Sequence, residues 1–387
     1  MIKICYITTI PGAIESFVLK TAESLYANEK WDISFICDAD EHFHKMLPPY
    51  FHYYPVKMKR GISLSGVRAM LEMKKIFKRE RFDLIQYSTP NASLYASLAG
   101  KLAGVPVRLY CQWGMAFVGM EGFRRKLFRL EEKLVCKLST WIEPDSKSNL
   151  DFCHREGLYP KNKGSVVGYG SACGVDLHKF DIAKKELYRE AIRKQHLIPS
   201  ESFVFIYVGR ITRDKGINEL LSAFRSIISE RNDVRLLMVG RPEKTETLEK
   251  DLYEWSLSCG QIIYTGQSSV VEQYLSAADC YILPSYREGF GMGTIEAEAM
   301  GVPVIVTDIP GPIDAMIPNV TGLCVEKKNA AALRDAMVSM MTKKDIGEYG
   351  RNGYRFVKEH FDQEILFPLI LKDRKKLLGT EGKEKES

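Results

Sequence analysis

Short apolar, β-branched runs alternate with helix-like segments along almost the whole chain, and this alternation most limits its possible folds. In the helix-like segments, apolar residues recur at the spacing of one helical face. Such βα repetition predicts parallel sheets with helices on both faces. A chain of 387 residues is too long for a single core and suits two domains. We therefore predict an α/β protein with two doubly wound, Rossmann-like domains.

The first half predicts strands at 2–7, 31–37, 51–56, 83–87, 107–111 and 141–143. Its predicted helices are 15–27, 64–77, 92–103, 124–138 and 146–156. The second half predicts strands at 203–208, 234–239, 261–264, 280–283 and 304–306. Its predicted helices are 216–230, 245–257, 270–277 and 294–300, with further helical segments up to residue 361.

The charged segment 181–199 predicts the domain boundary. We assign residues 1–182 to the first domain and 183–362 to the second. A last helix at 363–378 is expected to pack back on the first domain, and the polar tail 379–387 is expected to be disordered. The two domains are expected to face a central cleft, because such sheets bind ligands beyond the carboxyl ends of their strands.

Composition restricts the environment and the partners. No apolar run reaches the length of a membrane span, and the N-terminus lacks the features of a signal peptide. Nine scattered cysteines without a C-x-x-C pair suggest buried, reduced thiols. We therefore expect a cytoplasmic protein. Residues 1–180 carry 26 basic and 18 acidic residues, a net charge of +8, and the remainder carries −2. This asymmetry suggests an anionic partner for the first half.

The stretch from Glu288 to Glu296 is the strongest candidate for a functional site. It reads as strand, glycine-rich loop and helix, and such a loop directs backbone N–H groups at an anion above the helix N-terminus. A carboxylate accepts both hydroxyls of a cis-diol, so Glu296 could hold a ribose and Glu288 could reach sugar hydroxyls. Glu298 is expected on a different, solvated face of the helix. The plainer interpretation makes Glu296 a carboxylate favoured by the helix dipole.

Two further loops follow the first strand of each domain. In the second domain, Gly209-Arg210 and Lys215 flank a strand-to-helix turn, and their cations suit a diphosphate. An ordinary solvated basic turn, with an ion pair to Asp214, is an equally good interpretation of that loop alone. In the first domain, Gly12 would let a ligand approach the backbone, although a plain βα turn would explain it as well.

Two other features suggest a metal or a membrane. Asp38-Ala-Asp40 spells D-x-D, but a lone D-x-D is common by chance, and we interpret it as a solvated surface loop without metal. Residues 115–130 mix bulky apolar side chains with a basic cluster, and helix 64–79 adds more basic residues. These segments predict weak, salt-sensitive contact with an anionic bilayer. Helices packed on their own sheet with a solvated basic face are the alternative.

Residues 284–305 resemble the motif P-S-x-x-E-G-F-G-x-x-x-x-E-A-x-A-x-G-x-P-V-I of the family-4 retaining glycosyltransferases of GT-B fold. Residues 209–216 are similar to that family's G-R-x-x-x-x-K-G, residues 174–180 to its G-V-D-x-x-x-F, and residues 321–323 to its T-G-L. Pro11-Gly12 to Phe17 and Lys59 to Ile62 resemble the bacterial capsule, O-antigen and exopolysaccharide branch. The resemblance covers nearly the whole chain.

The resemblance implies a hexosyltransferase that moves sugar from a nucleotide diphosphate sugar, with UDP expected, to a lipid-linked glycan in bacterial surface polysaccharide synthesis. Arg210 and Lys215 would bind the donor diphosphate, with Gly209 in the same loop, and Glu296 would hold the ribose. The donor sugar would lie against Glu288, Gly289, Phe290 and Gly291, with Gly12 facing the diphosphate. The first domain would be the acceptor side. The resemblance implies no cofactor, no mandatory metal and no nucleic acid partner, and it places the protein in the cytoplasm or at the inner face of the membrane.

One departure keeps alternatives open. Many members of the family carry a His just after the strand that matches 107–111, where this chain has Gln112-Trp113-Gly114. We expect Gln112 or Trp113 to line the acceptor side instead. Without the His, a catalytically impaired nucleotide-sugar-binding relative is an alternative. A dinucleotide-dependent oxidoreductase ranks lower, because Gly289, Gly291 and Gly293 have the wrong spacing for G-x-G-x-x-G.

Overall fold

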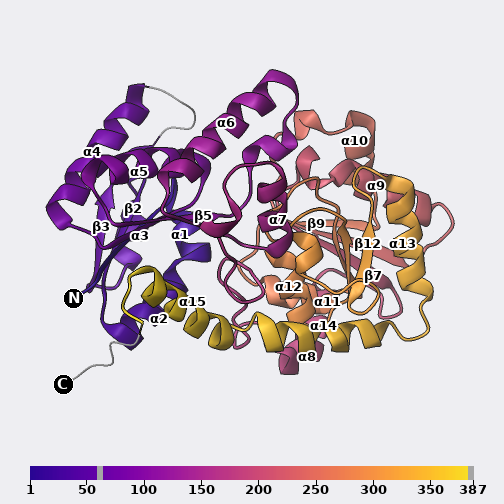
Figure 1. Ribbon diagram of the computed structural model, residues 1–387. Helices are drawn as coiled ribbons and strands as arrows, with labels where there is room; N and C mark the ends of the chain where they lie inside the picture. The colour runs from indigo at the N-terminus through magenta and orange to yellow at the C-terminus, as the bar shows by residue number, and fades with distance from the viewer. Residues whose placement is uncertain (59–63, 382–387) are drawn as a thin grey trace. The chain divides into compact units, whose positions relative to one another are not determined.

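The computed structural model describes residues 1–58 and 64–381 and divides into two compact units (Figure 1). The first unit comprises Met1–Cys173 and Glu364–Ser387, and the second comprises Gly174–Gln363. The segment Lys59 to Ile62, part of the resemblance, lies outside the described residues, as does most of the tail predicted to be disordered.

The first unit is built on a parallel six-stranded sheet of order β3-β2-β1-β4-β5-β6. Its strands are β1 Lys3–Ile7, β2 Asp32–Cys37, β3 Phe51–Pro55, β4 Leu84–Tyr87, β5 Val107–Gln112 and β6 Trp141–Pro144. Its helices are α1 Pro11–Phe17, α2 Leu19–Glu29, α3 Glu41–Met46, α4 Leu64–Glu80, α5 Pro90–Ala103, η1 Ala116–Gly119, α6 Gly122–Leu138, α7 Lys147–Arg155, η2 Lys161–Lys163 and α15 Gln363–Leu377.

The second unit has a parallel six-stranded sheet of order β12-β11-β10-β7-β8-β9. Its strands are β7 Phe203–Val208, β8 Val234–Val239, β9 Ile262–Gly266, β10 Cys280–Leu283, β11 Val304–Thr307 and β12 Gly322–Val325. Its helices are η3 Ile182–Lys184, α8 Lys185–Gln195, η4 Arg213–Lys215, α9 Ile217–Ile228, η5 Thr245–Thr247, α10 Lys250–Ser258, α11 Val271–Ala277, α12 Met292–Ala299, η6 Pro312–Asp314, α13 Ala330–Thr342 and α14 Ile346–His360.

When the six strands of each unit are numbered from the first to the last along the chain, both sheets have the same doubly wound strand order. This confirms the predicted fold class. Successive strand residues enter different cores: Cys5 and Ile7 of β1 lie in one apolar cluster, and Ile4 and Tyr6 lie in another. This is the period of two expected for a sheet buried on both faces. The strand order reverses between β1 and β4 in the first sheet and between β7 and β10 in the second, and ligands bind at such switch points.

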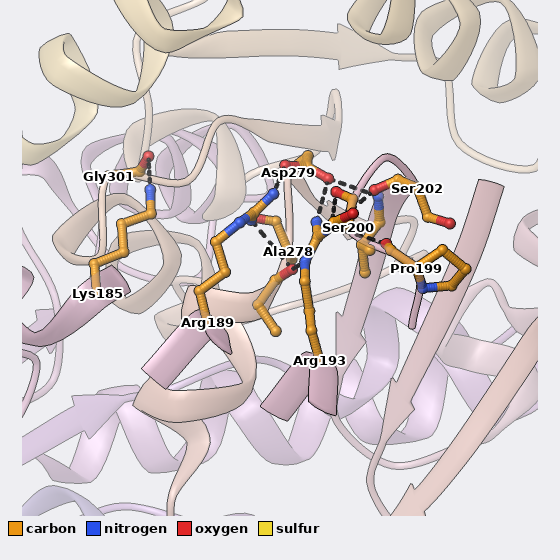
Figure 2. A network of polar contacts seen from close by, with 11 residues as sticks. Lys185, Arg189, Arg193, Pro199, Ser200, Ser202, Ala278, Asp279 and Gly301 are labelled. Carbon is orange, nitrogen blue, oxygen red and sulfur yellow. Dashed lines mark hydrogen bonds and ion pairs between the residues drawn. The ribbon is translucent and has the colours of Figure 1, made fainter. Parts of the chain in front are cut away.

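The segment expected to join the domains is an integral helix of the second unit. In α8, Arg189 and Arg193 both bond Asp279, at 2.6 and 2.8 Å, and Lys185 donates to the carbonyl of Gly301 at 2.9 Å (Figure 2). The unit already begins at Gly174, because Val175 and Phe180 lie in its core. The predicted boundary at residue 182 is therefore too far along the chain.

Helix α15 belongs to the first unit, although it follows the second in sequence. Arg374 is 2% exposed and bonds both carboxylate oxygens of Glu143, at 2.5 and 2.9 Å, and the amide oxygen of Gln86 at 3.1 Å. Lys375 pairs with Glu29 at 2.6 Å. These contacts tie α15 to β6, β4 and α2, since a buried guanidinium must keep its partners.

Candidate active site

The loops after β7 and β10 meet at the switch point of the second sheet. Lys215 Nζ lies 2.6 Å from Glu288 Oε1, and the hydroxyl of Ser285 donates to the same oxygen at 2.7 Å. The side chains of Lys215 and Glu288 are 18% and 13% exposed. A cation and a carboxylate from separate predicted motifs therefore form one partly desolvated pair, where their charges act more strongly than in water.

Gly216 makes this approach possible. Its φ is +71°, and a Cβ there would lie 2.0 Å from the carbonyl oxygen of Pro284. Any side chain would strain the backbone and push the β7 loop away from the β10 loop. The glycine of the K-G pattern therefore positions Lys215 beside Glu288.

Arg210 lies on the same β7 loop but is directed at other acids. Its guanidinium is 3.2 Å from Glu243 and 3.9 Å from Asp214, and its side chain is 47% exposed. Burial opposes ionisation of Asp214, but the hydroxyl of Thr212 and the guanidiniums of Arg287 and Arg210 outweigh it and hold its pKa below the usual value. The ion pair to Asp214 considered from the sequence is present. In this structure Arg210 pairs with Glu243 and Asp214, whereas Lys215 pairs with Glu288 of the glycine-rich loop.

Helix α12 begins directly after the glycine-rich loop. Its N-cap is Gly291, with φ +91° and no side-chain cap bond, and the dipole at such a helix N-terminus favours an anion. Phe290 is 2% exposed, and its ring lies 5.3 Å from that of Phe361. Only the backbone of Phe290 can therefore serve a ligand, as the resemblance implies, while its side chain fixes the loop to the core.

Glu296, one turn into α12, is half-buried, and burial raises the pKa of its carboxyl to about 7. The positive charge of Lys179 lowers that pKa, and the negative charge of Glu272 raises it. Lys179 Nζ lies 3.9 Å from Glu272 Oε2, and Glu272 is 6% exposed. The sequence did not single out these two neighbours. The sequence offered one signal for Lys179, because it directly precedes Phe180 of the G-V-D-x-x-x-F segment.

The prediction that Glu298 is solvated is wrong. Glu298 is fully buried, and burial raises the pKa of its carboxyl well above the usual range. It faces Gly353 of α14, where an added Cβ would lie 2.9 Å from Glu298 Cγ. The helical periodicity of α12 places Glu298 and Glu296 on different faces. It could not show that α14, which follows much later in the chain, covers the face that carries Glu298.

The first unit presents the other predicted residues. Gly12, in the first turn of α1, is exposed, and no described atom lies within 4 Å of the position of its missing Cβ. Gln112 is 1% exposed: its amide donates to Glu132 and accepts from the thiol of Cys153 at 3.0 Å. The prediction that Gln112 lines an acceptor surface is therefore wrong, because its side chain is satisfied inside the core. The ring of Trp113 packs 5.3 Å from that of Phe17.

The D-x-D stretch has a structural explanation. Asp40 caps α3 by accepting the backbone N–H of Phe43 at 2.8 Å, and the backbone carbonyl of Asp38 accepts the Tyr53 hydroxyl at 2.7 Å. In residues 1–58 and 64–381, no group of three or more His, Cys, Asp or Glu side chains is arranged to hold a metal ion. The sequence had not predicted α3, because the acidic stretch was interpreted as a surface loop.

Comparison with known proteins identifies the family. The model for glycosyl transferases group 1 matches residues 188–353, and the model for glycosyl transferase 4-like proteins matches residues 3–142. A capsular polysaccharide biosynthesis glycosyltransferase, CapM of Staphylococcus aureus, is 30% identical over 314 residues, 81% of this chain and 82% of that protein.

The chain belongs to the group 1 glycosyltransferases.

This glycosyltransferase has further relatives of similar length. The UDP-Gal:alpha-D-GlcNAc-diphosphoundecaprenol alpha-1,3-galactosyltransferase of Escherichia coli is 26% identical over 365 residues, 91% of each protein. Among solved structures, Anabaena HepE in complex with UDP-glucose superposes with a TM-score of 0.77 at 17% identity, covering 97% of this chain and 100% of HepE. That likeness supports the GT-B fold.

Proposed function

We propose that this glycosyltransferase moves a hexose from a UDP-linked donor to a lipid-linked glycan during bacterial surface polysaccharide synthesis, with retention at the anomeric carbon. The names of the Staphylococcus aureus and Escherichia coli relatives support the pathway and the lipid-linked acceptor, and the UDP-glucose complex of HepE supports the donor. The Lys215–Glu288 pair at the switch point carries the proposal within this chain.

In the proposed reaction, the bond between the anomeric carbon and the diphosphate oxygen breaks while the acceptor oxygen forms the new glycosidic bond, and the acceptor's hydroxyl proton passes to the leaving diphosphate. Negative charge then grows on the leaving diphosphate. Lys215 and Arg210 stabilise that charge, and the N–H groups at the start of α12 add a fixed dipole. No metal is required in this scheme.

The remaining site residues position the donor. Ionised Glu296 accepts the ribose hydroxyls, and Glu288 with the backbone N–H groups of Phe290 and Gly291 holds the sugar. Gly209 and Gly289 lie in the two loops that receive the donor. Because Glu288 already holds Lys215, it also keeps the ammonium directed into the site.

The test is transfer from UDP-sugars to a diphosphoundecaprenyl-linked glycan, followed by mass spectrometry of the product. Lys215→Ala and Glu288→Ala should each lower turnover roughly 100-fold or more, the typical cost of losing one transition-state charge contact. Lys250→Ala, which removes an 81% exposed lysine of α10, is the control and should leave turnover unchanged. Wild-type turnover in both site variants would reject the assignment. A chain that binds donor without any transfer or hydrolysis would be the impaired relative.

We also propose that the enzyme acts at the inner face of the cell membrane through α6. Four large apolar side chains, Phe123, Leu127, Leu130 and Leu134, are 78%, 45%, 62% and 41% exposed. Their spacing of three or four residues places them on one face, opposite the face that carries buried Val135 and Cys136. Exposed Lys126, Lys133 and Lys137 lie beside this stripe, the pattern of an interfacial helix. No helix in the described part of the chain has the length and apolarity to cross a bilayer.

Co-sedimentation with vesicles tests this contact. The protein should pellet with vesicles that contain phosphatidylglycerol at low salt and dissociate as salt rises, because surface charges are screened. Leu130→Asp with Leu134→Asp should abolish pelleting, and failure of the wild type to pellet at low salt would reject the proposal.

A further inference from the structure

A hollow of about 520 Å³ lies in the first unit at the end of α6. It is lined by Lys133, Cys136 and Lys137 of α6 and by Gly157, Leu158, Tyr159, Pro160 and Lys163 from the segment after α7. Cys136, Leu158 and Tyr159 are buried and form an apolar floor. Three lysines stand around it, and no acid is among its described lining residues. Its size is that of a small-molecule site.

The charges of the hollow favour an anion. Lys163 Nζ donates to the carbonyl oxygens of Cys136 and Lys137, at 2.7 and 3.3 Å. It thereby offsets the negative end of the α6 dipole, which would otherwise repel an anion. Lys133 and Lys137 are exposed and make no ion pair among the described residues, so their ammonium groups remain available.

The hollow lies at the amino edge of the first sheet and beside the apolar stripe. Helix α6 ends at Leu138, directly before β6 begins at Trp141, so the hollow is at the amino ends of the strands. Ligands of doubly wound sheets react at the opposite, carboxyl edge. Lys133 and Lys137 are one turn from Leu130 and Leu134 on the helix surface, and the hollow is therefore continuous with the surface proposed to meet the bilayer.

We propose that this hollow binds one anionic phospholipid, with its phosphate at Lys133 and Lys137 and its first methylenes on Leu158 and Tyr159. Charge complementarity and continuity with the stripe identify this occupant. The inference rests on the proposed membrane contact and adds lipid selectivity to it. The bound lipid is an anchor and not the glycan acceptor, since it lies at the amino edge of the first sheet, opposite the carboxyl edge where doubly wound sheets bind their reacting ligands.

The experiment uses dihexanoyl phosphatidylglycerol and dihexanoyl phosphatidylcholine below their micelle-forming concentrations, titrated into the full-length protein by calorimetry. The anionic lipid should bind roughly tenfold more tightly or better, because charge-assisted contacts to phosphate favour it. Lys133→Gln with Lys137→Gln should remove that preference. Lys75→Gln with Lys78→Gln, an equal charge loss on α4, should retain it, as should Phe123→Ser with Leu127→Ser in the stripe.

Equal binding of the two lipids, or undiminished preference in the Lys133/Lys137 variant, would overturn the lipid site. Vesicle pelleting tests the stripe separately. If vesicles bind but the monomeric anionic lipid does not, the lipid site is wrong and the membrane contact stands. If the monomeric lipid binds but vesicles do not, the membrane contact is wrong and the hollow is a lipid site without it. Binding of glycerophosphoglycerol as tightly as the lipid would also overturn the proposal, because the apolar floor would then contribute nothing.

Discussion

The two units share one strand order but differ at their switch points. In the second unit, the loops after β7 and β10 meet through the Lys215–Glu288 ion pair. In the first unit, the equivalent loops after β1 and β4 meet through hydroxyls: Thr89 Oγ1 accepts the backbone N–H of Thr9 at 3.0 Å and lies 2.9 Å from Thr9 Oγ1. The fold supplies the same location twice, and the loop residues decide its chemistry.

This difference concerns the charge that each switch point offers to a ligand. A diphosphate needs fixed cations, which the second unit supplies at its switch point. The first unit offers uncharged hydroxyls at the same place, and Thr89 is held there with φ +69°, an unusual conformation for a β-branched residue. Neutral, polar loops suit sugar hydroxyls, and the first unit as the acceptor side stays a prediction.

The largest predicted effect tests whether the units are independent cores. Asp279→Ala should destabilise the second unit by about 3 kcal/mol, since it leaves the guanidinium of Arg193, 6% exposed, without its carboxylate. In differential scanning calorimetry, the transition of the second unit should fall while that of the first stays in place. Asp233→Ala, which breaks an exposed pair with Arg231, is the control and should move neither transition. Equal shifts of both transitions would show that the units do not unfold independently.

A smaller effect distinguishes two acids, one from each unit. Glu143 of the first unit is paired with Arg374, whereas Glu298 of the second has a raised pKa because of burial. Between its unfolded and folded pKa values, Glu298 binds a proton only when folded, so stability falls as pH rises, by at most about 1.4 kcal/mol per pH unit. Glu298→Gln should flatten this slope in urea unfolding at pH 5 to 8. A slope identical to that of the wild type would contradict the assignment.

The smallest predicted effect concerns donor binding by Glu296. Its pKa of about 7 means that the carboxylate needed to accept ribose hydroxyls is lost as pH falls through neutrality. Affinity for UDP-glucose should therefore fall several-fold, at most roughly tenfold, from pH 8 to pH 6. Glu296→Gln should bind more weakly at pH 8 and show a flatter profile. An unchanged pH profile in that variant would mean that another group titrates.

Sequence patterns predicted the fold and the two second-unit loops that the structure brings together at Lys215 and Glu288, because both depend on local signals. The strand runs are short and apolar, and the K-G and E-G-F-G segments place their charges at fixed distances from strand ends. The predictions that were wrong concern residues whose contacts lie far away in the sequence. The burial of Glu298 under α14 and of Gln112 between Glu132 and Cys153 could not be found by local spacing. Helix α8 was interpreted as a boundary because its arginines look solvated until Asp279 is placed beside them.

The central claim is that the second unit's switch point, and not the first's, binds the donor diphosphate. Calorimetric titration of UDP into the wild type, Lys215→Met and Thr9→Val tests it directly, with no need to know the sugar or the acceptor. Lys215→Met should weaken binding roughly tenfold or more through the lost charge contact, while Thr9→Val should bind UDP within about twofold of the wild type. Unchanged affinity in Lys215→Met, or a larger loss in Thr9→Val, would contradict the account.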